Sequence, residues 1–139
     1  MDGKLVGDDP LPRCVGSRPV VSHIHAPGLT GVAVERVAPG VTLVRVRGEV
    51  DLLTAPSLRA ELDYQVDLMP SVLIIDLTRV AFFGVSGVEV LIEIYQRARR
   101  TEILLRLVAN TRAVARMVKV LQLDRFFSIY HELADALTG

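Results

Sequence analysis

The most chemically suggestive stretch of this sequence is a serine between glycines, in Gly84-Val85-Ser86-Gly87. A hydroxyl at the start of a helix is a good acceptor for a phosphoryl group, because the dianion would lie against free backbone N–H groups and the positive end of the helix dipole. Free N–H groups at Gly87 and Val88 would also suit the phosphate of a ligand. However, Ser86 is followed three residues later by Glu89, the S-x-x-E pattern of a capping box. Since such a cap is worth about 1 kcal/mol, the spacing alone favours a structural serine.

No set of residues typical of an enzyme accompanies this serine. Ser86 has no histidine with an evident structural reason to reach it, and the phosphate-binding patterns G-x-x-x-x-G-K-[ST] and G-x-G-x-x-G are absent. No buried pair of carboxylates can be identified. His23 and His25 form a His-Ile-His sequence without a Cys, Asp or Glu partner at a metal-ligand spacing, and His131 is isolated. We therefore expect no enzyme, no metal site and no cofactor.

The composition favours a single-domain cytoplasmic protein. The 139 residues are half hydrophobic and carry 16 basic and 16 acidic side chains. A nucleic-acid-binding domain would need a clustered basic excess, and a transmembrane helix would need about 20 consecutive apolar residues. The amino terminus lacks the pattern of a secretory signal, and the one cysteine, Cys14, cannot form an internal disulfide. We therefore expect neither nucleic-acid nor membrane partners, whereas an apolar sheet edge or loop would be compatible with a homodimer.

Alternating strands and helices are expected to position Ser86. The apolar run Val72-Leu73-Ile74-Ile75 is typical of a strand buried on both faces, and it leads through Asp76 and a short apolar loop to the serine. A helix follows, since apolar residues then recur at helical spacing. A hairpin with its turn at Ala38-Pro39-Gly40 precedes this unit. The other predicted elements are strands at 32–37, 41–47, 102–109 and 126–130 and helices beginning near Thr54, Thr111 and Glu132.

This order of elements predicts an α/β fold, with a mixed, mostly parallel sheet of about five strands and about four helices. Arg45 and Arg47 alternate with valines in the second strand of the hairpin, which favours a solvated sheet face over an anion-binding patch. Residues 1–29 contain four prolines and no sustained hydrophobic period. We therefore expect a flexible N-terminal arm over residues 1–29 and one domain over residues 30–139.

The loop before the serine is apolar, with Val80, Ala81, Phe82, Phe83 and Val85 around the turn. Some of these side chains must pack beneath the following helix. Exposure of Phe83 or Val85 would create an apolar contact patch for a partner protein beside the helix start.

Four segments, in order, resemble the sulfate-transporter and anti-sigma-factor-antagonist (STAS) domain, specifically the stand-alone bacterial anti-sigma factor antagonists. The resemblance covers Val32 to Gly139. The matching segments are Gly48-Glu49-Val50-Asp51 with Thr54-Ala55 for the family's G-E-[LV]-D, Val72 to Thr78 for [VI]-[VI]-[LI]-D-L, Phe82 to Val88 for F-[ML]-D-S-[ST]-G-L, and Thr111 to Val114 with Leu121 to Phe127 for the closing region.

The resemblance implies a STAS fold and a binding module rather than an enzyme. Such a protein docks on an anti-sigma factor, often a serine kinase with the histidine-kinase-like ATPase fold, and so releases a sigma factor. The kinase inactivates the antagonist by phosphorylating the serine directly after the family's aspartate. The residues that the resemblance assigns to the partner-binding loop are Phe83, Gly84, Val85, Ser86 and Gly87, with Glu49 and Asp51 near the binding surface.

The sequence departs from the family at the position of this switch. Gly84 replaces the aspartate and Val85 replaces the phosphate-accepting serine. Three interpretations follow: a constitutive antagonist, phosphorylation one residue later at Ser86, or a STAS scaffold that is controlled in another way. We expect loss of the usual switch, with Ser86 as a helix cap. A different class of function is a sensor of nucleotides or lipids, for which Arg79 is the only basic side chain near the loop.

Overall fold

The sheet of this protein combines antiparallel strands at its amino-terminal side with parallel strands in the remainder. The computed structural model describes residues 20–22 and 29–139, and within them the sheet has six strands in the order β1-β2-β3-β4-β5-β6. The pairs β1–β2 and β2–β3 are antiparallel, and β3 to β6 run parallel. The strands are β1 (Val20–Ser22), β2 (Leu29–Ala38), β3 (Val41–Val50), β4 (Val72–Phe83), β5 (Leu104–Val108) and β6 (Ser128–Tyr130).

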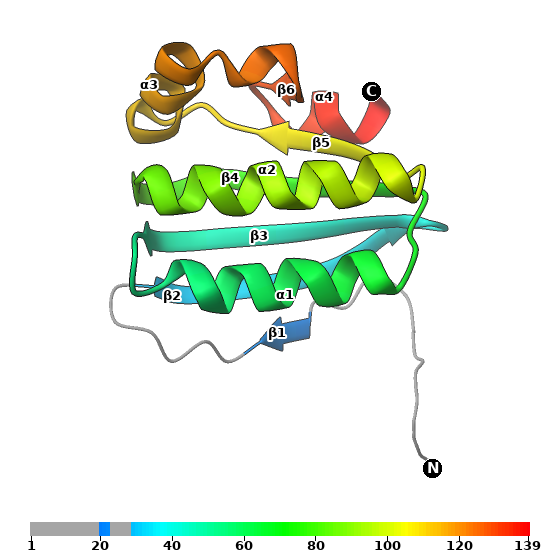
Figure 1. Ribbon diagram of the computed structural model, residues 1–139. Helices are drawn as coiled ribbons and strands as arrows, with labels where there is room; N and C mark the ends of the chain where they lie inside the picture. The colour runs from blue at the N-terminus through cyan, green and yellow to red at the C-terminus, as the bar shows by residue number, and fades with distance from the viewer. Residues whose placement is uncertain (1–19, 23–28) are drawn as a thin grey trace.

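Helices cover the two faces of this sheet unequally. α1 (Ala55–Asp67), α2 (Val85–Arg100) and α3 (Arg112–Leu121) each connect neighbouring parallel strands, so right-handed crossovers place them all on one face. Figure 1 shows α1 and α2 running across that face. On the opposite face α4 (Leu133–Thr138) packs against a smaller cluster. Its buried strand residues are Leu43, Ile74 and Val108, with the partly buried Val37, Val41, Val72 and Tyr130 packed against them. A short 3-10 helix, η2 (Leu123–Arg125), follows α3.

The predicted α/β class, the mixed sheet and the four α-helices are confirmed in the described residues. The sixth strand, β1, was not predicted; it pairs with residues 32–34 of β2 at the edge of the sheet. Of the segment expected to be a flexible arm, residues 1–19 and 23–28 lie outside the described residues, and with them Cys14, His23 and His25.

β4 is longer than the sequence suggested. The apolar stretch up to Phe83, which was expected to be a loop, continues the strand because β3 runs beside it and pairs Val50 with Phe83. The register between β3 and β4 is irregular at two places, after Arg45 and after Gly48. Gly48 has φ of +100°, a conformation that favours glycine. These irregularities bury Val80 and Phe83 and leave Phe82 exposed.

Ion pairs join α1 to α2. The Arg97 guanidinium donates to Asp67 at 2.7 Å and to Asp63 at 3.1 Å, and Arg59 donates to Glu93 at 2.7 Å. The hydrogen bond to Asp67, followed by that to Asp63, raises the pKa of Arg97 above its ordinary value. Exposed pairs of this kind contribute about 1 kcal/mol or less to stability.

Candidate functional site

The serine loop begins where β4 ends beside β3. The Gly84 N–H donates to the Val50 carbonyl at 2.9 Å, and α2 begins at Val85 with Gly84 as its N-cap. Ser86 therefore lies inside the first turn of α2, and no side-chain hydrogen bond caps this helix. The predicted capping box of Ser86 and Glu89 is wrong, because the extended conformation of Gly84 starts the helix two residues earlier than a cap at Ser86 requires.

The backbone N–H groups that were expected to be free are also occupied. Gly87 and Val88 both donate to the Gly84 carbonyl, at 3.0 and 3.3 Å. The prediction that they hold the phosphate of a ligand is therefore wrong. Ser86 is partly buried. Its side chain projects from the first turn of α2 and does not cap the helix.

Gly87 allows α2 to pack directly onto the end of the sheet. A Cβ atom at this position would lie 2.7 Å from Cε1 of Phe83 and 2.8 Å from Cγ1 of Val50, closer than side-chain atoms approach in native packing. Phe83 itself is buried. Of the five residues expected to form the partner-binding loop, Phe83 and Gly87 thus support the loop from beneath, whereas Val85 is exposed at its surface.

The loop between β3 and α1 is held by Asp51 and Thr54. Oδ1 of Asp51 accepts hydrogen bonds from the N–H groups of Leu53 and Thr54, both at 3.0 Å. The buried Thr54 hydroxyl accepts from the Asp51 N–H at 2.8 Å and donates to the Glu49 carbonyl at 2.8 Å. Asp51 is therefore an architectural residue of this loop, whereas Glu49 is exposed to solvent.

Four large apolar side chains are exposed on these two loops and at their base. Their exposed fractions are 78% for Leu52, 67% for Leu53, 51% for Phe82 and 62% for Val85. The loops are neighbours because Glu49 pairs with Phe82 and because Gly84 bonds to Val50. We call these four side chains the loop-end patch. Figure 1 shows both loops at the end of the sheet to which the arrows of β3 and β4 point.

The sequence indicated Val85 as part of such a patch but not Leu52 or Leu53. The two leucines follow Asp51 directly, and their exposure results from the turn that the Asp51 carboxylate stabilises. An Asp-x-x-Thr sequence that encloses two leucines is the signal that would have identified them, since Asp and Thr side chains close such turns by bonding to backbone groups.

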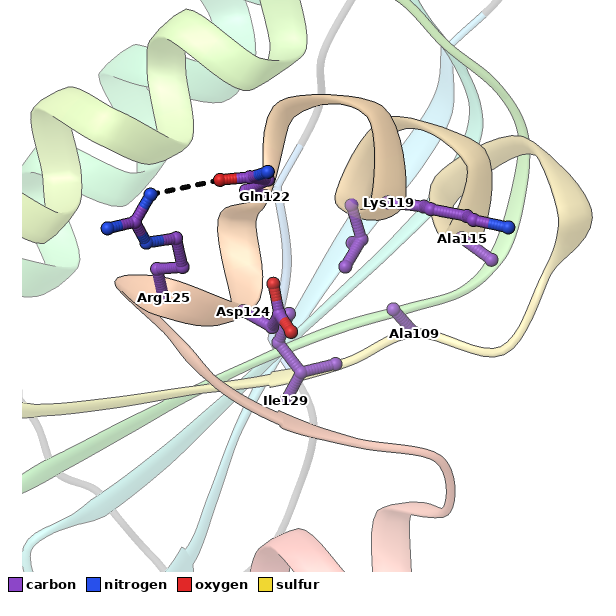
Figure 2. Close-up of a pocket in the computed structure, with 8 residues that line it drawn as sticks. Ala109, Ala115, Lys119, Gln122, Asp124, Arg125 and Ile129 are labelled. Carbon is purple, nitrogen blue, oxygen red and sulfur yellow. Dashed lines mark hydrogen bonds between the residues drawn. The ribbon is translucent and has the colours of Figure 1, made fainter.

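A cavity of about 590 Å³ lies elsewhere, beside α3. Figure 2 shows Lys119 and Arg125 on opposite sides of it, with Asp124 extending between them and the Arg125 guanidinium bonded to Gln122. That hydrogen bond is 2.9 Å long. The remaining lining residues are apolar: Ala109, Ala115, Val118 and Ile129. None of the residues predicted for the partner-binding loop lines this cavity.

Two further observations concern the described part of the chain. Within residues 20–22 and 29–139, no group of three or more His, Cys, Asp and Glu side chains is placed to hold a metal ion. None of the helices described here combines the length and apolarity needed to cross a membrane. His131 is exposed, and its carbonyl accepts a hydrogen bond from the Asn110 side chain at 3.0 Å.

Comparison with known proteins places this geometry in a family. The family model described as the STAS domain matches residues 33–136. The anti-sigma-F factor antagonist RsfB of Mycobacterium tuberculosis is 32% identical over 100 residues, which are 72% of this chain and 81% of the relative.

Solved structures give the same result. The crystal structure of an anti-sigma factor antagonist from Mycobacterium paratuberculosis superimposes with a TM-score of 0.75 at 37% identity, covering 81% of this chain and 95% of that one. The Bacillus cell-fate determinant SpoIIAA in its phosphorylated form shares the fold, with a TM-score of 0.62 at 16% identity over 77% of this chain and 96% of that one. This chain therefore belongs to the STAS domain family.

Proposed function

We propose that this protein is an anti-sigma factor antagonist of the cytoplasm, which binds a kinase-type anti-sigma factor and thereby frees a sigma factor. Two relatives above 30% identity are anti-sigma factor antagonists, which supports a regulatory binding role rather than catalysis. The binding surface in this proposal is the end of the sheet where β3 and β4 lead into α1 and α2.

The loop-end patch is the observation that carries the proposal. Isolated exposed apolar side chains are normal, but clustered ones mark interaction surfaces. Leu52, Leu53, Phe82 and Val85 are more than half exposed and come from two loops that the β3–β4 pairing holds together. Phe83 and Gly87 are buried beneath the patch and packed closely, which favours a preorganised surface, and preorganised surfaces bind with a smaller entropy cost.

Substitution at Val85 tests this surface. The anti-sigma factor of the source organism would be captured with this protein as bait, identified and then purified separately. Its binding to the wild type and to each variant would be measured by calorimetric titration. Val85→Asp is expected to weaken binding by about tenfold or more, because it puts a charge into an apolar contact. Val120→Asp is the matched control, since Val120 on α3 has a similar exposed fraction of 67%.

The controls separate binding from folding. Circular dichroism and thermal unfolding of both variants should match the wild type, since both valines are exposed. Equal affinity of the wild type and Val85→Asp would contradict the proposed surface, and a purified anti-sigma factor that fails to bind wild type would contradict the proposed function.

The protein is further proposed to lack the usual phosphorylation switch. Val85 has no hydroxyl, and Ser86 lies one residue further into the first turn of α2. A kinase site adapted to the preceding position would have to accept a shifted and partly buried hydroxyl. The antagonist would then keep its affinity for the anti-sigma factor while the kinase is active and supplied with ATP.

Mass spectrometry after incubation with the anti-sigma kinase and ATP tests the missing switch. The wild type should remain unphosphorylated, whereas Val85→Ser, which restores a hydroxyl at the exposed first position of α2, should gain one phosphate. Stoichiometric phosphate on Ser86 of the wild type would contradict the proposal and favour a shifted switch.

The cavity beside α3 supports a second candidate function, the sensing of a nucleotide or a lipid. Its volume of about 590 Å³ falls within the range of about 300–1,000 Å³ that is usual for ligand sites. A thermal-shift screen with GTP, ATP and acyl ligands tests this function, because a ligand that binds the native state raises the midpoint of unfolding. A rise of several degrees that Val118→Trp abolishes would favour sensing through this cavity, and no shift with any ligand would exclude it for these ligand classes.

A further inference from the structure

Two arginines lie directly opposite each other on neighbouring strands near the loop-end patch. Arg47 of β3 is the register partner of Arg79 of β4, and both side chains are exposed. Arg45, two residues before Arg47, is exposed on the same face of β3. We call these three residues the arginine stripe. Sequence pattern alone indicated a solvated face for Arg45 and Arg47, which their exposure confirms. The pairing of Arg47 with Arg79 adds a third arginine to that face.

The arginine stripe lies on the sheet face that α1, α2 and α3 do not cover. Val46 and Val80, which neighbour Arg47 and Arg79 in sequence, are buried in the core beneath those helices, so the arginines point to the opposite face. There α4 covers Leu43, Ile74 and Val108. The arginine of β5 on this face, Arg106, is instead engaged, donating to the Ala136 carbonyl at 2.8 Å.

Two of the three arginines have no ion-pair partner within the described part of the chain. Arg45 approaches Glu35 at 4.0 Å and lies opposite Asp76 in the register. Among residues 31–139, neither Arg47 nor Arg79 has a carboxylate within ion-pair distance. Like charges directly opposite each other destabilise a sheet. Among residues 31–139 no ion pair offsets the repulsion between Arg47 and Arg79, and a local arrangement that costs stability is typical of a functional surface.

The stripe is continuous with the loop-end patch. Along β3 and β4, the residue pair after Arg47–Arg79 is Gly48–Val80, and the next is Glu49–Phe82. Phe82 belongs to the loop-end patch. A partner that covers Phe82 would therefore also meet the two guanidinium groups. Guanidinium groups bind carboxylates through two parallel hydrogen bonds and are less strongly hydrated than ammonium groups, which suits an interface.

We propose that the arginine stripe binds an acidic segment of the anti-sigma factor while the loop-end patch makes the apolar contact. This inference rests on the proposed function. Carboxylates of the partner would bridge Arg47 and Arg79 and remove the repulsion between them. Opposite charges on the two proteins would also accelerate their association, and salt would weaken that effect.

Charge reversal tests the stripe. The association rate with the purified anti-sigma factor would be measured by surface plasmon resonance, at low and at physiological salt, for the wild type and for the double variant Arg47→Glu, Arg79→Glu. The double variant is expected to associate about tenfold more slowly at low salt, with a flatter salt dependence. The matched control is Arg36→Glu, an exposed arginine of β2 near the opposite end of β3, where it pairs with Thr42.

Thermal unfolding shows whether any loss reflects binding or folding. The single variant Arg47→Glu should unfold at the same or a higher temperature than the wild type, because it replaces a like-charge pair with an opposite-charge pair. A double variant that associates like the wild type, or a control that slows association equally, would overturn the inference and leave the proposed function intact. Wild-type protein that does not bind the anti-sigma factor would overturn both.

Discussion

At the scale of single residues, the site depends on which polar side chains are engaged in hydrogen bonds to the backbone. The sequence presented Ser86 as the residue with a role and Asp51 as a residue near the binding surface. In the structure Asp51 and Thr54 satisfy the backbone of the β3–α1 loop, whereas α2 begins without a side-chain cap. The serine therefore contributes little to helix stability, and the aspartate acts through the shape of the loop that displays Leu52 and Leu53.

Substitution of Asp51 tests this architectural role. Asp51→Ala removes the acceptor of two backbone hydrogen bonds and is expected to lower the free energy of unfolding by about 1–2 kcal/mol. Asp51→Asn keeps an oxygen at the Oδ1 position and should retain most of that stability. Urea unfolding measures both variants. Equal stability of Asp51→Ala and the wild type would show that the loop does not need this carboxylate.

At the scale of elements, the first turn of α2 is positioned by close packing on the ends of β3 and β4. Val50 and Phe83 occupy the space that a side chain at position 87 would need. This contact fixes where α2 begins, and so it also fixes the exposed position of Val85.

Gly87→Ala is expected to lower the free energy of unfolding by about 1–3 kcal/mol, because an added methyl group overpacks a buried contact. Gly84→Ala is the control, since its Cβ would approach the exposed Phe82 ring most closely, at 3.1 Å, and the Val50 carbonyl only at an ordinary contact distance of 3.7 Å. The exposed ring can move. Differential scanning calorimetry compares the two. Equal costs at both positions would contradict the proposed packing role of Gly87.

Several helices and strands could be predicted from the sequence, but the residues at which some of them begin and end could not. Val72 to Ile75 identified the central strand because a run of branched apolar residues is typical of burial on both faces. The same sequence did not show that β4 reaches Phe83, since that length depends on pairing with β3. The start of a helix near Thr111 was predicted correctly, and the Thr111 hydroxyl caps it by accepting from the Val114 N–H at 3.3 Å. The cap at Ser86 failed because the conformation of Gly84 is set by its bond to Val50.

At the scale of the whole molecule, the surfaces proposed for binding gather at one end of the sheet and on its less covered face. Helices α1, α2 and α3 bury the opposite face in an aliphatic core, which leaves the loop-end patch and the arginine stripe adjacent and accessible. The sequence contained every residue of both surfaces, but the pairing of Arg47 with Arg79 required the irregular register between β3 and β4. Irregularities of this kind place extra residues in one strand and so change which side chains lie opposite each other.

The most direct test of the proposed antagonist function is the release of a sigma factor from its anti-sigma factor. The preformed complex of these two proteins would be mixed with an excess of this protein and separated by size-exclusion chromatography. Wild-type protein is expected to yield free sigma factor together with a new complex that contains the anti-sigma factor, whereas the same excess of Val85→Asp should free much less sigma factor. Sigma factor that stays bound in the presence of excess folded wild-type protein would contradict the account.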